Sequence, residues 1–146
     1  MPAHQPRDPD FEARVRDSFT RQRMMVTLGA DLQAVRPGRV EIVLPFRDDL
    51  TQQHGYLHGA AVTAIVDSAR GYAALTLTEP GREVLSVEFK VNLVPPAAGS
   101  TFVAVGRVLR SGRTLTVCAG EALAERNGER AVIAVMQATM ISVPVS

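Results

Sequence analysis

Residues 58–77, HGAAVTAIVDSARGYAALTL, form the stretch of sequence that best indicates the fold. Asp67 and Arg70 are its only charged residues, and small apolar side chains occupy nearly every face of the helix it could form. Its alanine content favours helix, and a helix that is apolar on all sides is normally buried. The stretch therefore predicts a central helix that the rest of the chain must cover.

The chain that follows this helix predicts a series of antiparallel strands. Apolar and polar residues alternate over 83–94, the clearest period of two in the sequence. Asn127-Gly128 is the strongest available hairpin signal, and short turns between successive strands produce antiparallel pairing. Four strands are expected, at residues 83–94, 101–110, 113–125 and 130–142.

The chain that precedes the helix predicts a further helix and two strands. Asp8-Pro9 is a helix-start signal, and apolar residues then recur every fourth position up to a predicted end near Met25. Pro37-Gly38 marks a turn between two short apolar stretches. The other expected elements are a loose tail at residues 1–7, strands at 29–35 and 39–46, and a loop at 47–57.

A helix that is apolar on all sides requires a curved sheet around it. The 146 residues suffice for one domain with a sizeable core. The sequence thus predicts a single α+β domain over residues 1–146. In it, a curved, mostly antiparallel sheet of five to six strands wraps the buried helix, and an extra helix precedes the sheet.

Composition and charge exclude several classes of protein. The hydrophobic fraction is 46% and the charged fraction 21%, which is typical of a folded domain. The net charge is +1 and the basic residues form no cluster, so neither nucleic acid nor a membrane is an expected partner. Lys90 is the only lysine among 16 basic residues. Because arginine binds phosphates in a bidentate manner, the composition is compatible with a phosphorylated small ligand.

Cys118 is the only cysteine, so no disulfide can form within the chain. This suits a reducing compartment. The sequence near Met1 has no signal-peptide pattern, and no apolar run is long enough to span a membrane, so cytoplasm is the expected location. Cys118 lies among apolar strand residues, which favours an inert buried thiol.

The start of the central helix holds residues with chemical potential. Gly59 lies at this start, so its N–H and that of Ala60 lack intrahelical partners and could bind an anion or a developing oxyanion. A glycine that only permits a tight turn is the alternative. Asp67 is expected to be buried, where a carboxylate is costly unless it is paired or used. It either forms an ion pair with Arg70 or serves chemistry.

His54 and His58 are four residues apart, a spacing that can indicate a metal site. However, Gly55 lies between them in a loop, and no third ligand has convincing spacing. A histidine that orients the loop or caps the helix is the favoured interpretation, and no metal is expected. The sequence also lacks the G-x-S-x-G, G-x-G-x-x-G and Walker motifs.

Three segments resemble one known family: QQHGYLHGAAVTAIVDSA at residues 52–69, VEFKVNLVPPA at 87–97 and SGRTL at 111–115. The resemblance, which covers roughly residues 11–142, is to the hot-dog-fold acyl-CoA thioesterases of the phenylacetate-pathway (PaaI) type. It implies the hot-dog fold, in which a curved antiparallel sheet wraps one helix. It also implies a homodimer joined edge to edge, often doubled to a homotetramer.

The resemblance implies hydrolysis of an acyl-CoA to a free acid and CoA, with no cofactor besides the CoA of the substrate. It implies that the Gly59 N–H polarises the thioester carbonyl and that Asp67 acts as general base or nucleophile. Three further residues receive implied catalytic roles. Gln52, where many relatives have Asn, helps position substrate or water, His58 holds the loop and the helix start, and Ser86 holds the water.

The resemblance also implies contacts with the substrate. Arg110 and Arg113 match a basic hairpin that often meets the phosphates of CoA, and Ala60 replaces the second glycine of the usual H-G-G. His54 and Asn92 complete the expected substrate-binding set.

Two other functions are compatible with the same fold. One is non-catalytic binding of an acyl-CoA or a small aromatic ligand, and the other is a hydratase, which would need a histidine and an acid in one site. The presence of both Gly59 and Asp67 favours the thioesterase. Pocket walls from Tyr56, Val62 or Tyr72 suggest an apolar acyl group.

Gly59 and Asp67 lie eight residues apart, a rise of about 12 Å along a helix. A base and an oxyanion donor that serve one thioester must each come within about 3 Å of their targets. The two residues of one chain are too far apart for this. The sequence therefore predicts that each active site combines Gly59 of one chain with Asp67 of a two-fold-related partner.

Overall fold

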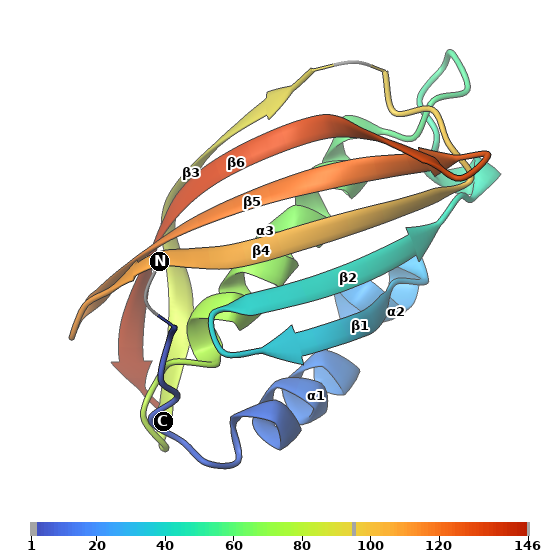
Figure 1. The fold of residues 1–146 in the computed structure, drawn as a ribbon. Helices are drawn as coiled ribbons and strands as arrows, with labels where there is room; N and C mark the ends of the chain where they lie inside the picture. The colour runs from blue at the N-terminus through green and yellow to red at the C-terminus, as the bar shows by residue number, and fades with distance from the viewer. Residues whose placement is uncertain (1–2, 95, 146) are drawn as a thin grey trace.

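A curved sheet of six strands wraps around one long helix, α3 (Gly59–Leu75), in the computed structural model, which describes residues 3–94 and 96–145 (Figure 1). The strand order is β1-β2-β4-β5-β6-β3, and all neighbouring strands are antiparallel. This arrangement confirms the predicted α+β hot-dog fold. The strands are β1 (Asp31–Arg36), β2 (Arg39–Pro45), β3 (Arg82–Leu93), β4 (Thr101–Ser111), β5 (Leu115–Arg126) and β6 (Glu129–Pro144).

The predicted central helix and strands are all present, and their ends differ from the expected ones by at most two residues. Asn127 and Gly128 form the predicted hairpin turn with φ angles of 52° and 79°, the left-handed conformation that such turns require. The predicted loop at 47–57 contains a short 3₁₀ turn, η1 (Asp48–Leu50). Local turn chemistry and alternation were therefore sufficient to place these elements.

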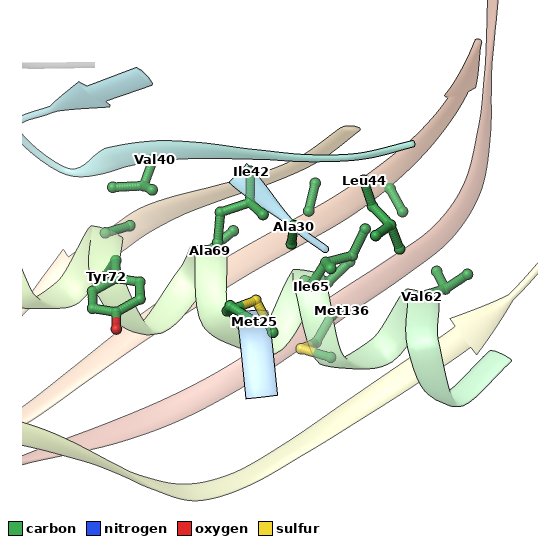
Figure 2. Close-up of a cluster of buried hydrophobic side chains, with 14 of the residues drawn as sticks. Met25, Ala30, Val40, Ile42, Leu44, Val62, Ile65, Ala69, Tyr72 and Met136 are labelled. Atoms are coloured by element: carbon green, nitrogen blue, oxygen red, sulfur yellow. The ribbon is translucent and has the colours of Figure 1, made fainter. Parts of the chain in front are cut away.

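Helix α3 packs closely on the concave face of the sheet. Figure 2 shows Ile65 and Ala69 of α3 facing Ile42 and Leu44 of β2, and all four side chains are buried. Burial of such apolar side chains is the main favourable contribution to folding. The helix thereby holds its remaining residues at fixed positions over the sheet.

Two glycines permit this close approach. Gly106 of β4 and Gly120 of β5 are directly opposite each other in the sheet. A Cβ atom at Gly106 would collide with the α3 backbone at Ala69 and Arg70, and one at Gly120 would lie 2.6 Å from a methyl group of Val66. Glycine is required here because only a residue without a side chain leaves room for the helix.

The N-terminal helix is interrupted, in contrast to the single helix that the sequence predicted. Helices α1 (Phe11–Arg21) and α2 (Arg23–Leu28) are separated by Gln22, which is extended. The Gln22 side chain donates to the Tyr72 hydroxyl (2.9 Å) and accepts from the Ser68 hydroxyl (2.7 Å), both on α3. These tertiary hydrogen bonds hold Gln22 at the break between the two helices.

The predicted helix start at Asp8-Pro9 was also wrong by two residues, because α1 begins at Phe11. The Asp8 carboxylate accepts the N–H of Asp10 (2.8 Å) before the helix begins. Within the expected tail, residues 1 and 2 lie outside the described residues, and the His4 ring lies 3.1 Å from the Val108 carbonyl oxygen.

Strand β3 contains a bulge that the sequence did not predict. Ser86 pairs with Met140 and Glu88 pairs with Thr139, so Val87 is an extra residue. A bulge shifts the phase of alternation. Ser86 and Phe89 therefore share the inner face, where both contact Arg70. The expectation of one continuous period of two over 83–94 was wrong at this point.

None of the helices in the described part of the chain is both long enough and apolar enough to cross a membrane.

Candidate active site

The start of α3 leaves one backbone N–H free. The N–H of Ala60 donates to Nδ1 of His58 (2.9 Å), which confirms that His58 caps the helix. Within residues 3–94 and 96–145, the N–H of Gly59 has no hydrogen-bond partner. This donor lies at the positive end of a 17-residue helix, where a negative charge is stabilised. The sequence predicted two free N–H donors, at Gly59 and Ala60. Only that of Gly59 is free among the described residues, because His58 accepts the N–H of Ala60.

Gln52 shapes the loop before α3. Its side-chain oxygen accepts the N–H groups of His54 (2.6 Å) and Tyr56 (3.3 Å). The side-chain amide nitrogen of Gln52 is not used in these contacts. His54 is exposed, and it contacts Gln52 through its backbone N–H and not through its imidazole ring. Among the described residues, no three His, Cys, Asp or Glu side chains lie where they could share a metal ion.

A cavity of about 290 Å³, the Gly59 cavity, lies beside this helix start. Gln52 and the exposed Leu93 line it, and Leu93 packs directly over Gly59. Most of its wall is apolar, so it suits an apolar group placed next to one N–H donor. Its lining residues are Gln52, Tyr56, Leu57, Gly59, Val62, Leu93, Pro96, Ala97 and Ile133.

Asp67 and Ser86 line a different cavity, the Asp67 cavity, of about 340 Å³. The sequence expectation that Asp67 is buried was wrong for the single chain, because its side chain is 41% exposed. One face of α3 is left open by the sheet, and Asp67 lies on it. The polar part of the wall consists of Ser18, Gln22, Asp67, Ser68, Tyr72, Glu83 and Ser86.

Arg70 is the charged residue of α3 that is buried, with 0% exposure. It forms an ion pair with Asp67, as one of the two sequence interpretations proposed. It also donates to the Ser86 hydroxyl (2.9 Å). The ion pair does not remove Asp67 from solvent, so the carboxylate remains accessible from the cavity.

Arg113 belongs to a third cavity, the hairpin cavity, of about 320 Å³. Arg7 and Arg82 also line it, together with the acidic Glu79 and with serine and threonine residues, so its charged residues are three arginines and one glutamate. The sequence did not identify Arg7 or Arg82, because they come from segments far from the 111–115 hairpin. Such a cluster of arginines and hydroxyls suits a phosphorylated group.

Two residues of the expected substrate-binding set lie elsewhere. Arg110 pairs with Val117 after a bulge and lies on the outer face of the sheet. Asn92 pairs with Val135, also on the outer face, whereas the next residue, Leu93, points toward Gly59. The single chain therefore groups Gln52 with Gly59, Asp67 with Ser86, and Arg113 with two other arginines.

Cys118 lies in β5 and is buried. Burial raises the pKa of its thiol from about 9 to about 11, although the charge of Arg70 opposes the shift. A thiol with such a pKa is a poor nucleophile near neutral pH. This agrees with the inert thiol that the sequence predicted.

The raised pKa of Cys118 predicts a loss of stability in alkaline solution. Between pH of about 9 and 11 the unfolded thiol ionises while the folded thiol keeps its proton, so stability falls as pH rises. The loss reaches roughly 2–3 kcal/mol. Urea unfolding of the wild type and Cys118→Ala at several pH values in this range measures the loss. The free energy of unfolding should fall less steeply with pH in the variant than in the wild type. Equal slopes would contradict the shift.

Comparisons with known proteins agree with this fold. The family model described as the thioesterase superfamily matches residues 54–131, which is more than half of the chain. A thioesterase family protein from Silicibacter pomeroyi has 48% sequence identity and a TM-score of 0.91, over 92% of this chain and 99% of that one. The PaaI protein of E. coli has the same fold, with a TM-score of 0.81, 17% identity and 94% of each chain covered.

Two curated relatives match over a shorter part. Human acyl-coenzyme A thioesterase 13 is 32% identical over 85 residues, which are 58% of this chain and 60% of that protein. A protein of Saccharolobus solfataricus whose name describes it as an esterase is 34% identical over 80 residues, 55% of this chain and 56% of that protein. The chain thus spans less than two thirds of the length of these relatives. Together with the family match, the fold and the site geometry, these similarities place the chain in the thioesterase superfamily.

Proposed function

We propose that the protein is an acyl-CoA thioesterase, which hydrolyses its substrate to a free acid and CoA. The observation that carries this proposal is the free N–H of Gly59 at the start of α3, beside an apolar cavity. Thioester hydrolysis needs a donor for the developing oxyanion and a group that activates water or attacks the carbonyl. Gly59 supplies the first and Asp67 the second.

The proposed reaction begins with the thioester oxygen on the Gly59 N–H. Asp67 either takes a proton from the attacking water or attacks the carbonyl carbon itself. The carbonyl electrons move to the oxygen, where one preorganised donor contributes about 3–4 kcal/mol. Collapse of this tetrahedral species breaks the C–S bond and releases CoA as the thiolate. If water attacked, the free acid is formed in the same step, and the proton on Asp67 is returned to the thiolate or to solvent. If Asp67 attacked, water then hydrolyses the resulting acyl-aspartyl anhydride, which releases the acid and restores the carboxylate. Ser86 shares the Asp67 cavity, where its hydroxyl can hold the water.

The active site is proposed to form between two chains. Gly59 and Asp67 belong to the same helix, α3, but in one chain they line separate cavities. Strand β3 is a 12-residue edge of the sheet with exposed apolar side chains, and such edges pair readily with another chain. A homodimer joined at β3 is our proposed assembly, and a homotetramer stays a prediction from the family resemblance. Cytoplasm stays the expected location.

The two ends of the substrate are expected in different cavities. The Gly59 cavity is mostly apolar, and none of the described residues that line it is charged, so it would take a compact acyl group, aryl or short-chain. The hairpin cavity is lined by three arginines, so it would take the phosphates of CoA. The polar wall of the Asp67 cavity suits the amide groups of the pantetheine arm.

A panel of acyl-CoA substrates tests the proposed function. Aromatic and straight-chain acyl groups of increasing length are offered, and release of the CoA thiol is measured. Turnover of compact apolar groups is the expected result. Tight binding of the panel without thiol release would instead support the non-catalytic binder.

Arg113→Ala is expected to raise KM for acyl-CoA about tenfold or more, because a charge-assisted phosphate contact is lost. KM for a short acyl thioester without the nucleotide should change little. Arg110→Ala is the matched control, since its side chain lies on the outer face of the same hairpin. Steady-state kinetics on both substrates measure the difference. Equal effects on the two substrates would mean that Arg113 does not meet CoA.

A further inference from the structure

Arg70 has surroundings that neither the family resemblance nor the proposed reaction explains. Among the described residues, Arg70 has the largest side chain that is fully buried. A guanidinium group without water is costly unless its charge is paired and its donors are used. Asp67 is the carboxylate that pairs with it among the described residues. The charge of Arg70 is therefore matched by the residue proposed to perform the chemistry.

One nitrogen of Arg70 contacts two of the polar residues that line the Asp67 cavity. Nη2 donates to a carboxylate oxygen of Asp67 and to the hydroxyl oxygen of Ser86 (2.9 Å). Asp67 is on α3 and Ser86 is on β3, so this nitrogen links the helix to the edge strand. The second carboxylate oxygen of Asp67 has no partner in the described part of the chain, which leaves it available for reaction.

The guanidinium group is itself held in place. The ring of Phe89 lies 5.4 Å from its central carbon, a cation–π distance, and the Met140 sulfur contacts Nη1. Ser86 and Phe89 are three residues apart and would lie on opposite faces of a regular strand. The bulge at Val87 turns both toward Arg70. The irregular strand thus serves the surroundings of this arginine.

We propose that Arg70 is a positioning residue for the reaction. It fixes one oxygen of Asp67 and the hydroxyl of Ser86 at a set separation, while the other Asp67 oxygen faces the cavity. A half-exposed aspartate without this contact would rotate among several conformations. Pre-organisation of this kind raises the rate, because small misplacements of a reacting group are costly. The inference rests on the proposed thioesterase function and the role of Asp67 in it.

The test compares Arg70→Met and Arg70→Lys with the wild type. Methionine fills much of the buried volume without a charge, and lysine keeps the charge without the planar fork. Because Arg70 is buried and touches no substrate, both variants should lower kcat about 10- to 100-fold and change KM little. Lysine should retain more activity than methionine, since it can still pair with Asp67.

A double mutant separates positioning from a purely structural role. If Arg70 acts through Asp67, Arg70→Met should lower kcat little further in an Asp67→Asn background. Multiplicative losses in the double mutant would overturn the proposal. A folded Arg70→Lys with the kcat of the wild type would also overturn it, and this variant decides the question if Arg70→Met does not fold.

Arg14→Met is the matched control for the loss of a partly buried arginine. Arg14 donates to carbonyl oxygens of Leu75 and Thr78 at the end of α3, away from Asp67. Its replacement should lower the melting temperature but leave kcat unchanged. A parallel fall of kcat in this variant would assign the Arg70 effect to the fold. Wild-type turnover in Asp67→Asn would instead refute the role of Asp67, and no thiol release from any acyl-CoA by the wild type would refute the proposed function, so these failures are distinguishable.

Discussion

Asp67→Asn should fold and lose turnover by about 10²–10⁴-fold, the contribution of a positioned base. The amide is nearly isosteric with the carboxylate, and its oxygen can still accept the hydrogen bond from Arg70. It can neither take a proton from water nor attack a carbonyl carbon. KM should change less than kcat, because the residue acts on the reacting atoms and not on the CoA. Thiol release assays on the purified variant measure both constants.

The result depends on the variant remaining folded, since Asn leaves the charge of Arg70 unpaired. Removing one partner of a fully buried pair costs about 3–5 kcal/mol, and the cost here should be smaller because Asp67 is half exposed. Circular dichroism and thermal melting provide the control. Turnover near that of the wild type in a folded variant would reject Asp67 as base or nucleophile. Unfolding would support the purely structural ion pair.

Mixing two inactive variants should restore roughly a quarter of wild-type activity if each site uses two chains. One variant is Asp67→Asn and the other is Gly59→Pro, which removes the proposed oxyanion donor. Proline is tolerated at the first helical position. His58 before it has φ −63° and ψ 136°, which is compatible with a following proline. A Cβ atom at position 59 would meet the end of the Leu93 side chain, which is flexible and exposed.

The expected recovery follows from symmetry. With random pairing, half of the dimers are mixed, and each of these has one intact site and one site with both lesions. In a site built from a single chain every site keeps one lesion, and mixing restores nothing. The two variants are unfolded and refolded together, and exchange of subunits is verified with differently tagged chains. No recovery despite verified exchange would exclude the shared site.

Much of the fold could be predicted because its signals are local. The alanine-rich stretch, the hairpin turn at Asn127-Gly128 and the alternating strands each act within a few residues. The break at Gln22 could not be predicted, because it depends on partners 46 and 50 residues away in α3. The bulge at Val87 likewise depends on pairing with β6 and not on its own residue type.

The candidate site was predicted unevenly for the same reason. The helix start at His58-Gly59 is a local motif, and its cap is present. The sequence predicted that Asp67 is buried, whereas in the structure Arg70 is buried and Asp67 lies on the open face of α3. Periodicity alone could not decide this, because both residues lie on a helix that is apolar nearly all round. The face that the sheet leaves uncovered is a property of the whole fold.

The glycines that face α3 from the sheet have a consequence for how such a protein can diverge. Any side chain at Gly106 would displace the helix backbone next to Arg70, and with it Asp67, the group proposed to perform the reaction. Substitutions at Gly106 are therefore not tolerated without a shift of the helix. Tyr56 and Leu93 are exposed, and they can vary without affecting the contact between Gly106 and α3. The scaffold thus separates heritable change in substrate preference from change in catalytic geometry.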